Sequence, residues 1–304
     1  MAPPFLTYYF STYRPIHLPL TPKIAKQKLM FTLNCGGRLL TIHQPVVMGI
    51  LNINADSFYA GSRHGNDARL LNTAEQMLTA GATILDIGGQ STRPGSEQAS
   101  PDTELSRVIP VIEAITKNFP EAFISVDTFY SKVASEAVAA GAAIINDISA
   151  GSLDEHLLDT VASLNVPYIL MHMQGTPQNM QQNPVYENVT REVLDFLIKK
   201  LAILRSKGMK DIIIDPGFGF GKNTEHNYTL LKNLSLFRML DCPVLLGISR
   251  KAMVYRKLGT DADNALNGTS VLNTIGLLNG ASILRVHDVK EAVEAIKLVE
   301  ATQV

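Results

Sequence analysis

Polar and ionisable side chains stand at or directly after a series of short apolar runs along this chain. These side chains are Asn52, Asp86, Thr92, Arg93, Asp127, Asn146, Asp147, His172, Asp215, Lys251, Arg285 and His287. Any one of them alone would be interpreted as a helix cap or a loop hydrogen bond. Because unpaired buried charge is costly, a purely structural protein has no reason to collect so many of them at one edge. Together they predict an active site.

The cationic members of this set point to an anionic ligand. Arg93 follows the second apolar run, and Lys251, Arg285 and His287 belong to the last two. Arginine offers a rigid fork of donors that suits phosphate oxygens, and lysine adds a point charge. An anionic group on the substrate, of the kind that phosphate provides, is therefore expected.

The acceptor side chains point to two further partners. Asn52 carries a neutral oxygen that could bind Mg²⁺, an ion that keeps several waters and bridges phosphate oxygens. The carboxylates of Asp127 and Asp215 and the amide of Asn146 could read the donor edge of a nitrogen heterocycle. The same carboxylates could stabilise positive charge as it develops in a reaction.

The apolar runs themselves predict the scaffold. Eight of them alternate with amphipathic helical stretches: Val46–Leu51, Thr83–Ile87, Phe123–Val126, Ala143–Ile148, Pro167–Met171, Asp211–Ile214, Val244–Ile248 and Ile283–Val286. Eight βα units favour a closed (β/α)8 TIM barrel of the α/β class as one domain, and such barrels carry their chemistry at the carboxyl ends of the strands. Residues 31–42 predict a hairpin that turns at Gly36-Gly37 and closes the bottom of the barrel.

Composition excludes several classes of function. With a net charge of −1, a pI of about 6.7 and 46 % hydrophobic residues, the chain has a large core and no basic field for nucleic acid. No apolar run reaches the roughly 18 residues that a membrane span needs. Two cysteines, Cys35 and Cys242, are too few for a disulfide framework. We expect a soluble, cytoplasmic protein that binds neither nucleic acid nor membrane.

The first 29 residues differ from the rest. They hold several prolines and basic residues and no acidic residue, and they match neither a secretory signal nor a transit peptide well. We interpret 1–29 as an unstructured extension or a start assigned too early, and 30–304 as the barrel domain.

The glycine-rich run from Asp215 to Lys222 is not a nucleotide-binding loop. Three residues lie between Gly217 and Gly221, and Asn223 follows Lys222. The phosphate-binding loop instead needs four residues between its glycines and a hydroxyl residue after its lysine. The glycines instead suggest a tight loop that lays Phe218 or Phe220 against a planar ligand. For Phe218, a place in the ordinary core is equally consistent.

From about Met30 to its end, the chain resembles the dihydropteroate synthase family. The segments that carry the resemblance are Val47–Phe58, Asp86–Gly95, Ser125–Thr128, Ile145–Ile148, Leu170–Gly175, Ile214–Lys222, Ser249–Lys251 and Arg285–Asp288, in the family's order. The resemblance implies a transferase of folate (tetrahydrofolate) biosynthesis. This enzyme joins para-aminobenzoate to 6-hydroxymethyl-7,8-dihydropterin diphosphate, giving 7,8-dihydropteroate and diphosphate, with Mg²⁺ as cofactor and a homodimer as its assembly.

The resemblance also assigns roles residue by residue. Asn52 would bind Mg²⁺; Thr92, Arg93, Arg285 and His287 would hold the diphosphate; Asp127, Asn146, Asp215 and Lys251 would hold the pterin; and Phe58, Pro94, Phe220 and Lys251 would pack around the aminobenzoate. Asp127, Lys251 and Arg93 would be the catalytic residues. Asp127 would favour a cationic pterin methylene by electrostatics rather than as a nucleophile.

Two alternative functions remain open from the sequence. A methyltetrahydrofolate-dependent methyltransferase barrel would share the pterin pocket but would not need the diphosphate set. If the chain were a non-catalytic pterin-binding protein, we would expect Asn52, Asp127 or Lys251 to have been lost. All three are present. Three positions depart from the family pattern: Ala55 stands where Pro is common, Gln90 where Glu is common, and Ala252 where Ser is common. The second alternative stays because Ala55 and Gln90 lie in the loops after the first two strands, where catalytic competence could be lost.

Overall fold

The computed structural model describes residues 30–53, 63–90, 96 and 98–302. The predicted extension at 1–29 therefore lies outside the described residues. Among the described helices, none is long and apolar enough to cross a membrane.

Within these ranges, eight parallel strands form the predicted barrel. They are β3 (Val46–Asn52), β4 (Ile84–Gly88), β5 (Phe123–Asp127), β6 (Ile144–Asp147), β7 (Tyr168–Met171), β8 (Ile212–Asp215), β9 (Leu245–Leu246) and β10 (Ile283–Val286). Their order in the sheet is β8-β7-β6-β5-β4-β3-β10-β9. A parallel bridge between Ile214 and Val244, just before β9, joins the two ends of this order. The sheet is thus closed, and the fold prediction is confirmed.

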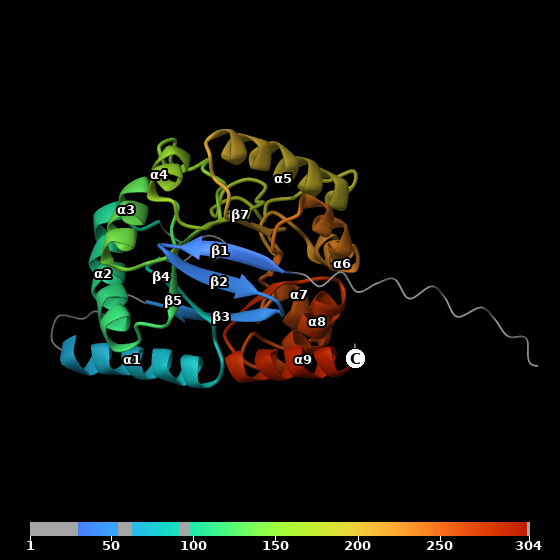
Figure 1. Cartoon of the computed structure of the whole chain (residues 1–304). Coiled ribbons are helices and arrows are strands. Elements are labelled where there is room, and N and C mark those ends of the chain that lie inside the picture. Colours follow the sequence, from blue (N-terminus) through green and yellow to red (C-terminus); the bar gives the residue numbers. More distant parts are fainter. Residues whose placement is uncertain (1–29, 54–62, 91–95, 97, 303–304) are drawn as a thin grey trace, which may run out of the picture.

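Helices cover the outside of the strands, as Figure 1 shows. They are α1 (Arg63–Thr79), α2 (Pro101–Asn118), α3 (Ser131–Ala140), α4 (Leu157–Leu164), α5 (Val189–Ser206), α6 (Thr224–Lys232), the 3-10 helix η2 (Leu234–Leu240), α7 (Ala252–Leu258), α8 (Leu266–Leu278) and α9 (Val289–Thr302). Helix α2 shows how the sequence sets these elements. Ser100 accepts a hydrogen bond from the backbone N–H of Thr103, Pro101 occupies the first helical position, and Val108, Ile112 and Ile115 bury one face.

The hairpin predicted over residues 31–42 is present as β1 (Phe31–Cys35) and β2 (Arg38–Ile42), which pair antiparallel. Gly36 and Gly37 have φ values of 63° and 89°, which glycine adopts without steric cost. Leu33, Cys35, Leu40 and Ile42 pack on the first residues of the barrel strands, including Met48 and Ile84. The hairpin therefore closes the amino-terminal end of the barrel (Figure 1) and leaves the opposite end for chemistry.

Candidate active site

Arg285 is the centre of an ionic cluster at the carboxyl ends of the strands. Its Nε donates to Oδ2 of Asp86 at 2.6 Å, and its Nη2 donates to Oδ2 of Asp127 at 2.8 Å. The amide of Asn146 also donates to Oδ2 of Asp86, at 3.1 Å. Asp86 lies on β4, Asp127 on β5, Asn146 on β6 and Arg285 on β10, so four strands supply one hydrogen-bonded group.

Burial decides the electrostatics of this cluster. Asp86 is fully buried and Asp127 is only 7 % exposed. Burial raises the pKa of Asp127, and the Arg285 guanidinium opposes that rise. Burial lowers the pKa of Arg285, but Asp86 and Asp127 outweigh it and leave the pKa above its usual value. Removing either partner of such a pair leaves a buried charge uncompensated.

Lys251 stands on the other side of the site, at the start of α7. Its Nζ donates to the backbone carbonyl of Phe218 at 2.5 Å and lies 4.8 Å above the ring centroid of Phe220. Burial lowers the pKa of Lys251 to about 8, against the opposing effect of Asp215. Asp215, at the end of β8, is buried, and its Oδ1 accepts from the N–H of Gly217 at 2.7 Å. Burial raises the pKa of Asp215, and Lys251 opposes this.

Asn52 and His287 complete the described part of the rim. Asn52 ends β3 with an exposed side chain, and a Cβ on Gly88 would lie 3.4 Å from its Oδ1 and 3.7 Å from Cβ of Asp127. His287 follows β10, and its Nδ1 lies 3.0 Å from Oγ of Ser249. The structure thus brings Asn52, Asp127, Asn146, Asp215, Phe220, Lys251, Arg285 and His287 to the same end of the barrel, as predicted. Phe58, Thr92, Arg93 and Pro94 lie outside the described residues.

A magnesium ion would have few protein ligands here. Among the described residues, no group of three or more His, Cys, Asp or Glu side chains could hold a metal. Asn52 is exposed and offers one neutral amide oxygen, which lies on the same side of Gly88 as Asp127. This set of donors fits a Mg²⁺ ion that is bound mainly by substrate phosphates and water and by one protein oxygen. It does not fit a metal ion whose ligands all come from the protein.

Two strand-end aspartates have functions that the sequence analysis did not assign. Asp86 was predicted at the rim without a role, and the structure shows it holding both Arg285 and Asn146. Asp147 faces away from this cluster, since its carboxylate accepts from Tyr168 Oη and from the N–H groups of Ser149 and Gly151. The alternation of side chains along a strand could have separated Asn146 from Asp147.

Phe218 and Phe220 lie on the predicted tight loop but in different surroundings. Phe218 is fully buried in the main core, whereas Phe220 packs beside Phe129 and Met171 under Lys251. Only Phe220 is placed to contact a planar ligand.

Gln90, where the family commonly has Glu, contacts a neighbouring helix. Its amide donates to Oε2 of Glu104 on α2 at 2.7 Å. Glu104 is fully buried, and burial raises its pKa to about 8. The amide of Gln90 therefore supplies a hydrogen bond to a carboxyl group that has lost contact with water.

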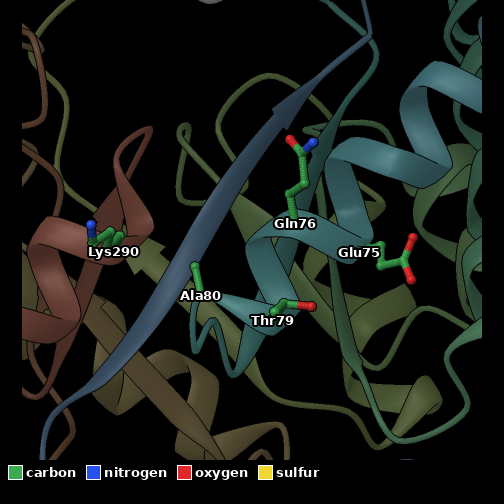
Figure 2. Close-up of a pocket in the computed structure, with 5 residues that line it drawn as sticks. All are labelled: Glu75, Gln76, Thr79, Ala80 and Lys290. Carbon is green, nitrogen blue, oxygen red and sulfur yellow. The ribbon is translucent and has the colours of Figure 1, made fainter.

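A shallow hollow of about 370 Å³ lies on the outer surface between α1 and α9 (Figure 2). Glu75, Gln76 and Thr79 of α1, Ala80 directly after it and Lys290 of α9 line it. None of these residues belongs to the strand-end set, so the hollow is separate from the site.

Comparisons with known proteins agree with this geometry. Residues 48–287 match the family model of pterin binding enzymes. A dihydropteroate synthase of Escherichia coli K12 is 45 % identical over 268 residues, which cover 88 % of this chain and 94 % of the relative.

Solved structures give the same result. A dihydropteroate synthase of Xanthomonas albilineans with 4-aminobenzoic acid is 40 % identical, with a TM-score of 0.83 over 90 % of this chain and 98 % of the other. A structure of the enzyme from the same organism with 7,8-dihydropteroate is 37 % identical, with a TM-score of 0.79 over the same shares of the two chains. The chain belongs to the pterin-binding enzyme family and, within it, to the dihydropteroate synthases.

Proposed function

We propose that the chain condenses 6-hydroxymethyl-7,8-dihydropterin diphosphate with para-aminobenzoate to give 7,8-dihydropteroate and diphosphate, as a transferase of folate biosynthesis. The observation that carries this proposal is the arrangement at the rim. Buried acceptors on β5, β6 and β8 lie at the same barrel mouth as two cations, one on β10 and one directly before α7. The dihydropteroate and 4-aminobenzoic acid in the solved relatives' structures support the same substrates here.

The pterin would bind to the acceptor side. The carboxylates of Asp127 and Asp215 would accept from the ring's N–H groups, while Asn146 and Lys251 would donate to its acceptor atoms. Asp127 and Asp215 are buried, so each carboxylate would gain a partner in place of lost water. The fixed hydrogen bonds from Arg285 and Gly217 hold these carboxylates in one orientation before the substrate binds.

The reaction breaks the bond between the pterin methylene carbon and the diphosphate oxygen, and the electron pair leaves with the diphosphate. The amine nitrogen of aminobenzoate then donates its lone pair to the methylene carbon and loses a proton. Asp127 would stabilise the positive charge on the pterin as the diphosphate departs. Thr92, Arg93, Arg285 and His287 would hold the departing anion, and Phe58, Pro94, Phe220 and the stem of Lys251 would pack around the aminobenzoate ring.

Mg²⁺ is proposed as the cofactor, and when bound it would neutralise charge on the leaving diphosphate. Asn52 would be its protein ligand, since it is an exposed residue at the rim whose amide oxygen lies on the same side of Gly88 as Asp127.

Substitution of Asn52 by Ala is expected to raise the Mg²⁺ concentration needed for half-maximal activity by about tenfold, the effect of losing one ligand oxygen near charged groups. Removing Mg²⁺ with a chelator should abolish activity in the wild type. A titration of initial rate against Mg²⁺ measures the shift, with Asn118→Ala, on the exposed end of α2, as the control. An unchanged half-saturation point would remove Asn52 from the metal site.

The two alternative functions are weaker. A methyltransferase barrel does not need cations arranged for diphosphate, yet Arg285 and His287 stand at the rim here. A non-catalytic binder does not need Asn52, Asp127 and Lys251 together, and all three lie at one barrel end.

The function is tested by diphosphate release from purified protein that is given the dihydropterin diphosphate, Mg²⁺ and para-aminobenzoate. Dihydropteroate formation that requires the amine supports the synthase. Tight pterin binding without any turnover would support the non-catalytic binder instead.

We also propose a homodimer that lies in the cytoplasm. Val271, Ile275 and Leu278 form an exposed apolar stripe on one face of α8, and Leu298 of the neighbouring α9 is also exposed. A second copy of the chain would cover this stripe. The cytoplasmic location is supported by Cys35 and Cys242, which are both buried and unpaired.

Light scattering is expected to give twice the 33.2 kDa chain mass for the wild type. Ile275→Glu should give the single-chain mass, because it places a charge in the apolar contact. Leu236→Glu, at an exposed position of η2, is the control and should stay dimeric. A wild type of single-chain mass would contradict the proposal.

A further inference from the structure

The amino group of Lys222 is buried in the loop between β8 and α6. Lys222 is only 2 % exposed. Its Nζ lies 2.8 Å from Nδ1 of His172, and it donates to the backbone carbonyls of Gly217 at 2.9 Å and Phe220 at 3.0 Å. A lysine is almost never fully buried unless it is paired, so this position has a specific structural demand.

Lys222 joins the two strand ends on which the loop rests. His172 directly follows β7, and Gly217 and Phe220 lie in the segment after β8. A Cβ on Gly217, whose φ is 72°, would lie 1.8 Å from the carbonyl oxygen of His172, so only glycine permits this close approach. Burial lowers the pKa of His172 to about 2, which keeps the ring neutral and its Nδ1 able to accept a hydrogen bond.

Other side chains fix the rest of the loop from outside. Gln181 donates to the carbonyl of Gly219, and Tyr186 donates to the carbonyl of Gly221 at 2.8 Å. The side chain of Asn227 accepts from the N–H of Gly219 at 2.8 Å. Successive backbone groups are therefore held by side chains from other elements, which gives the loop one conformation.

This loop supplies two contacts to Lys251. The carbonyl of Phe218 accepts from Lys251, and the ring of Phe220 lies beneath the same amino group. Lys222 binds the carbonyls on either side of Phe218 and so sets the position of both contacts. Asp127 and Asn146, in contrast, lie on strands that do not depend on the loop.

We infer that Lys222 is a positioning residue for the aminobenzoate side of the active site, acting with His172 through the loop that carries Phe218 and Phe220. This inference rests on the proposed function, because it assigns the consequence to one of the two substrates. Lys222 is not a catalytic residue, since its amino group is enclosed by the protein.

The first test replaces Lys222 by Met, which keeps the apolar stem and removes the amino group. KM for aminobenzoate should rise by about tenfold, the scale of one lost hydrogen bond. KM for the dihydropterin diphosphate should rise less. The loop reaches two of its proposed partners, Asp215 through the N–H of Gly217 and Lys251 through Phe218, whereas Asp127, Asn146 and Arg285 lie on the strands. Lys232→Met, on the exposed surface of α6, is the matched control. Equal changes in both KM values, or none, would overturn the inference.

A second pair of variants decides the question even where Lys222→Met does not fold. His172→Phe keeps the ring that packs edge-on against Phe196 but removes the acceptor, whereas His172→Asn keeps an acceptor and loses the ring. The inference predicts a higher KM for aminobenzoate in His172→Phe than in His172→Asn. A role in packing alone predicts the reverse order, and that order would overturn it.

These outcomes are separate from failure of the proposed function. A wild type without turnover refutes the synthase activity itself. An active wild type with no selective effect of these variants refutes only the role of Lys222.

Discussion

Replacing Lys251 by Ala is expected to lower kcat/KM for the dihydropterin diphosphate by about a hundredfold or more, the scale seen when a fixed donor is removed from an active site. Lys251 binds the carbonyl of Phe218, stacks above Phe220 and faces the buried Asp215. Its loss removes a donor to the pterin and leaves Asp215 without its opposing charge. Steady-state kinetics with both substrates measure the effect.

We expect the pH dependence of wild-type kcat/KM to follow the ionisation of Lys251. Burial lowers the pKa of Lys251 to about 8, so the charged form is lost as the pH rises through that value. The wild-type kcat/KM should therefore fall above about pH 8. Lys251→Arg keeps the charge to far higher pH and should lose this limb, even where its activity at neutral pH is lower.

Lys257→Ala provides the matched control for both measurements, since Lys257 lies on the same helix with an exposed side chain. It should keep the wild-type rate and pH profile. A Lys251→Ala variant with wild-type kinetics would exclude Lys251 from the site, and the assignment of the pterin pocket would then need revision.

The barrel could be predicted because each strand has a local signal. The run Val46–Leu51 is apolar, short and followed by a polar residue, and the structure places β3 there with one added residue. The two-residue β9 is the opposite case, since the run Val244–Ile248 predicts a longer strand than the structure contains. Gly247 and Ile248 lie instead between β9 and the turn at Ser249 and Arg250, and a Cβ on Gly247 would lie 3.8 Å from both Oδ2 of Asp215 and Nζ of Lys251. The strand is therefore shorter than its apolar sequence predicts, because the residues that follow β9 lie at the active site.

The site could be predicted as a set of residues but not as a set of contacts. The carboxyl ends of parallel strands meet, so Asp127, Asn146 and Asp215 had to lie near one another. Arg285 pairs with Asp127 and Asp86, which lie 158 and 199 positions away along the chain. The choice of these two carboxylates depends on the directions of side chains in the folded barrel. No local pattern encodes that choice, and for this reason Asp86 and Lys222 had no predicted role.

The second large effect is expected from Asp127→Asn, which should reduce kcat by about a hundredfold to a thousandfold, the range for losing one preorganised electrostatic contact. The asparagine has the same shape but carries no charge, so it cannot offset positive charge on the pterin. Nη2 of Arg285 would also lose its ionised acceptor, while Nε keeps Asp86. The expected drop in kcat is measured at saturating concentrations of both substrates, and the melting temperature is recorded in parallel.

Asp147→Asn separates this electrostatic role from a general need for buried aspartate. Asp147 is as deeply buried as Asp127, but its carboxylate accepts from Tyr168 and two backbone N–H groups and faces away from Arg285. An amide there would leave one donor mispaired, which costs about 1–3 kcal/mol of folding stability. Asp147→Asn should therefore lower the melting temperature and keep kcat, whereas Asp127→Asn should lower kcat. If both variants lost stability and kept kcat, the carboxylate of Asp127 would be structural, and stabilisation of the pterin cation would have to come from elsewhere in the site.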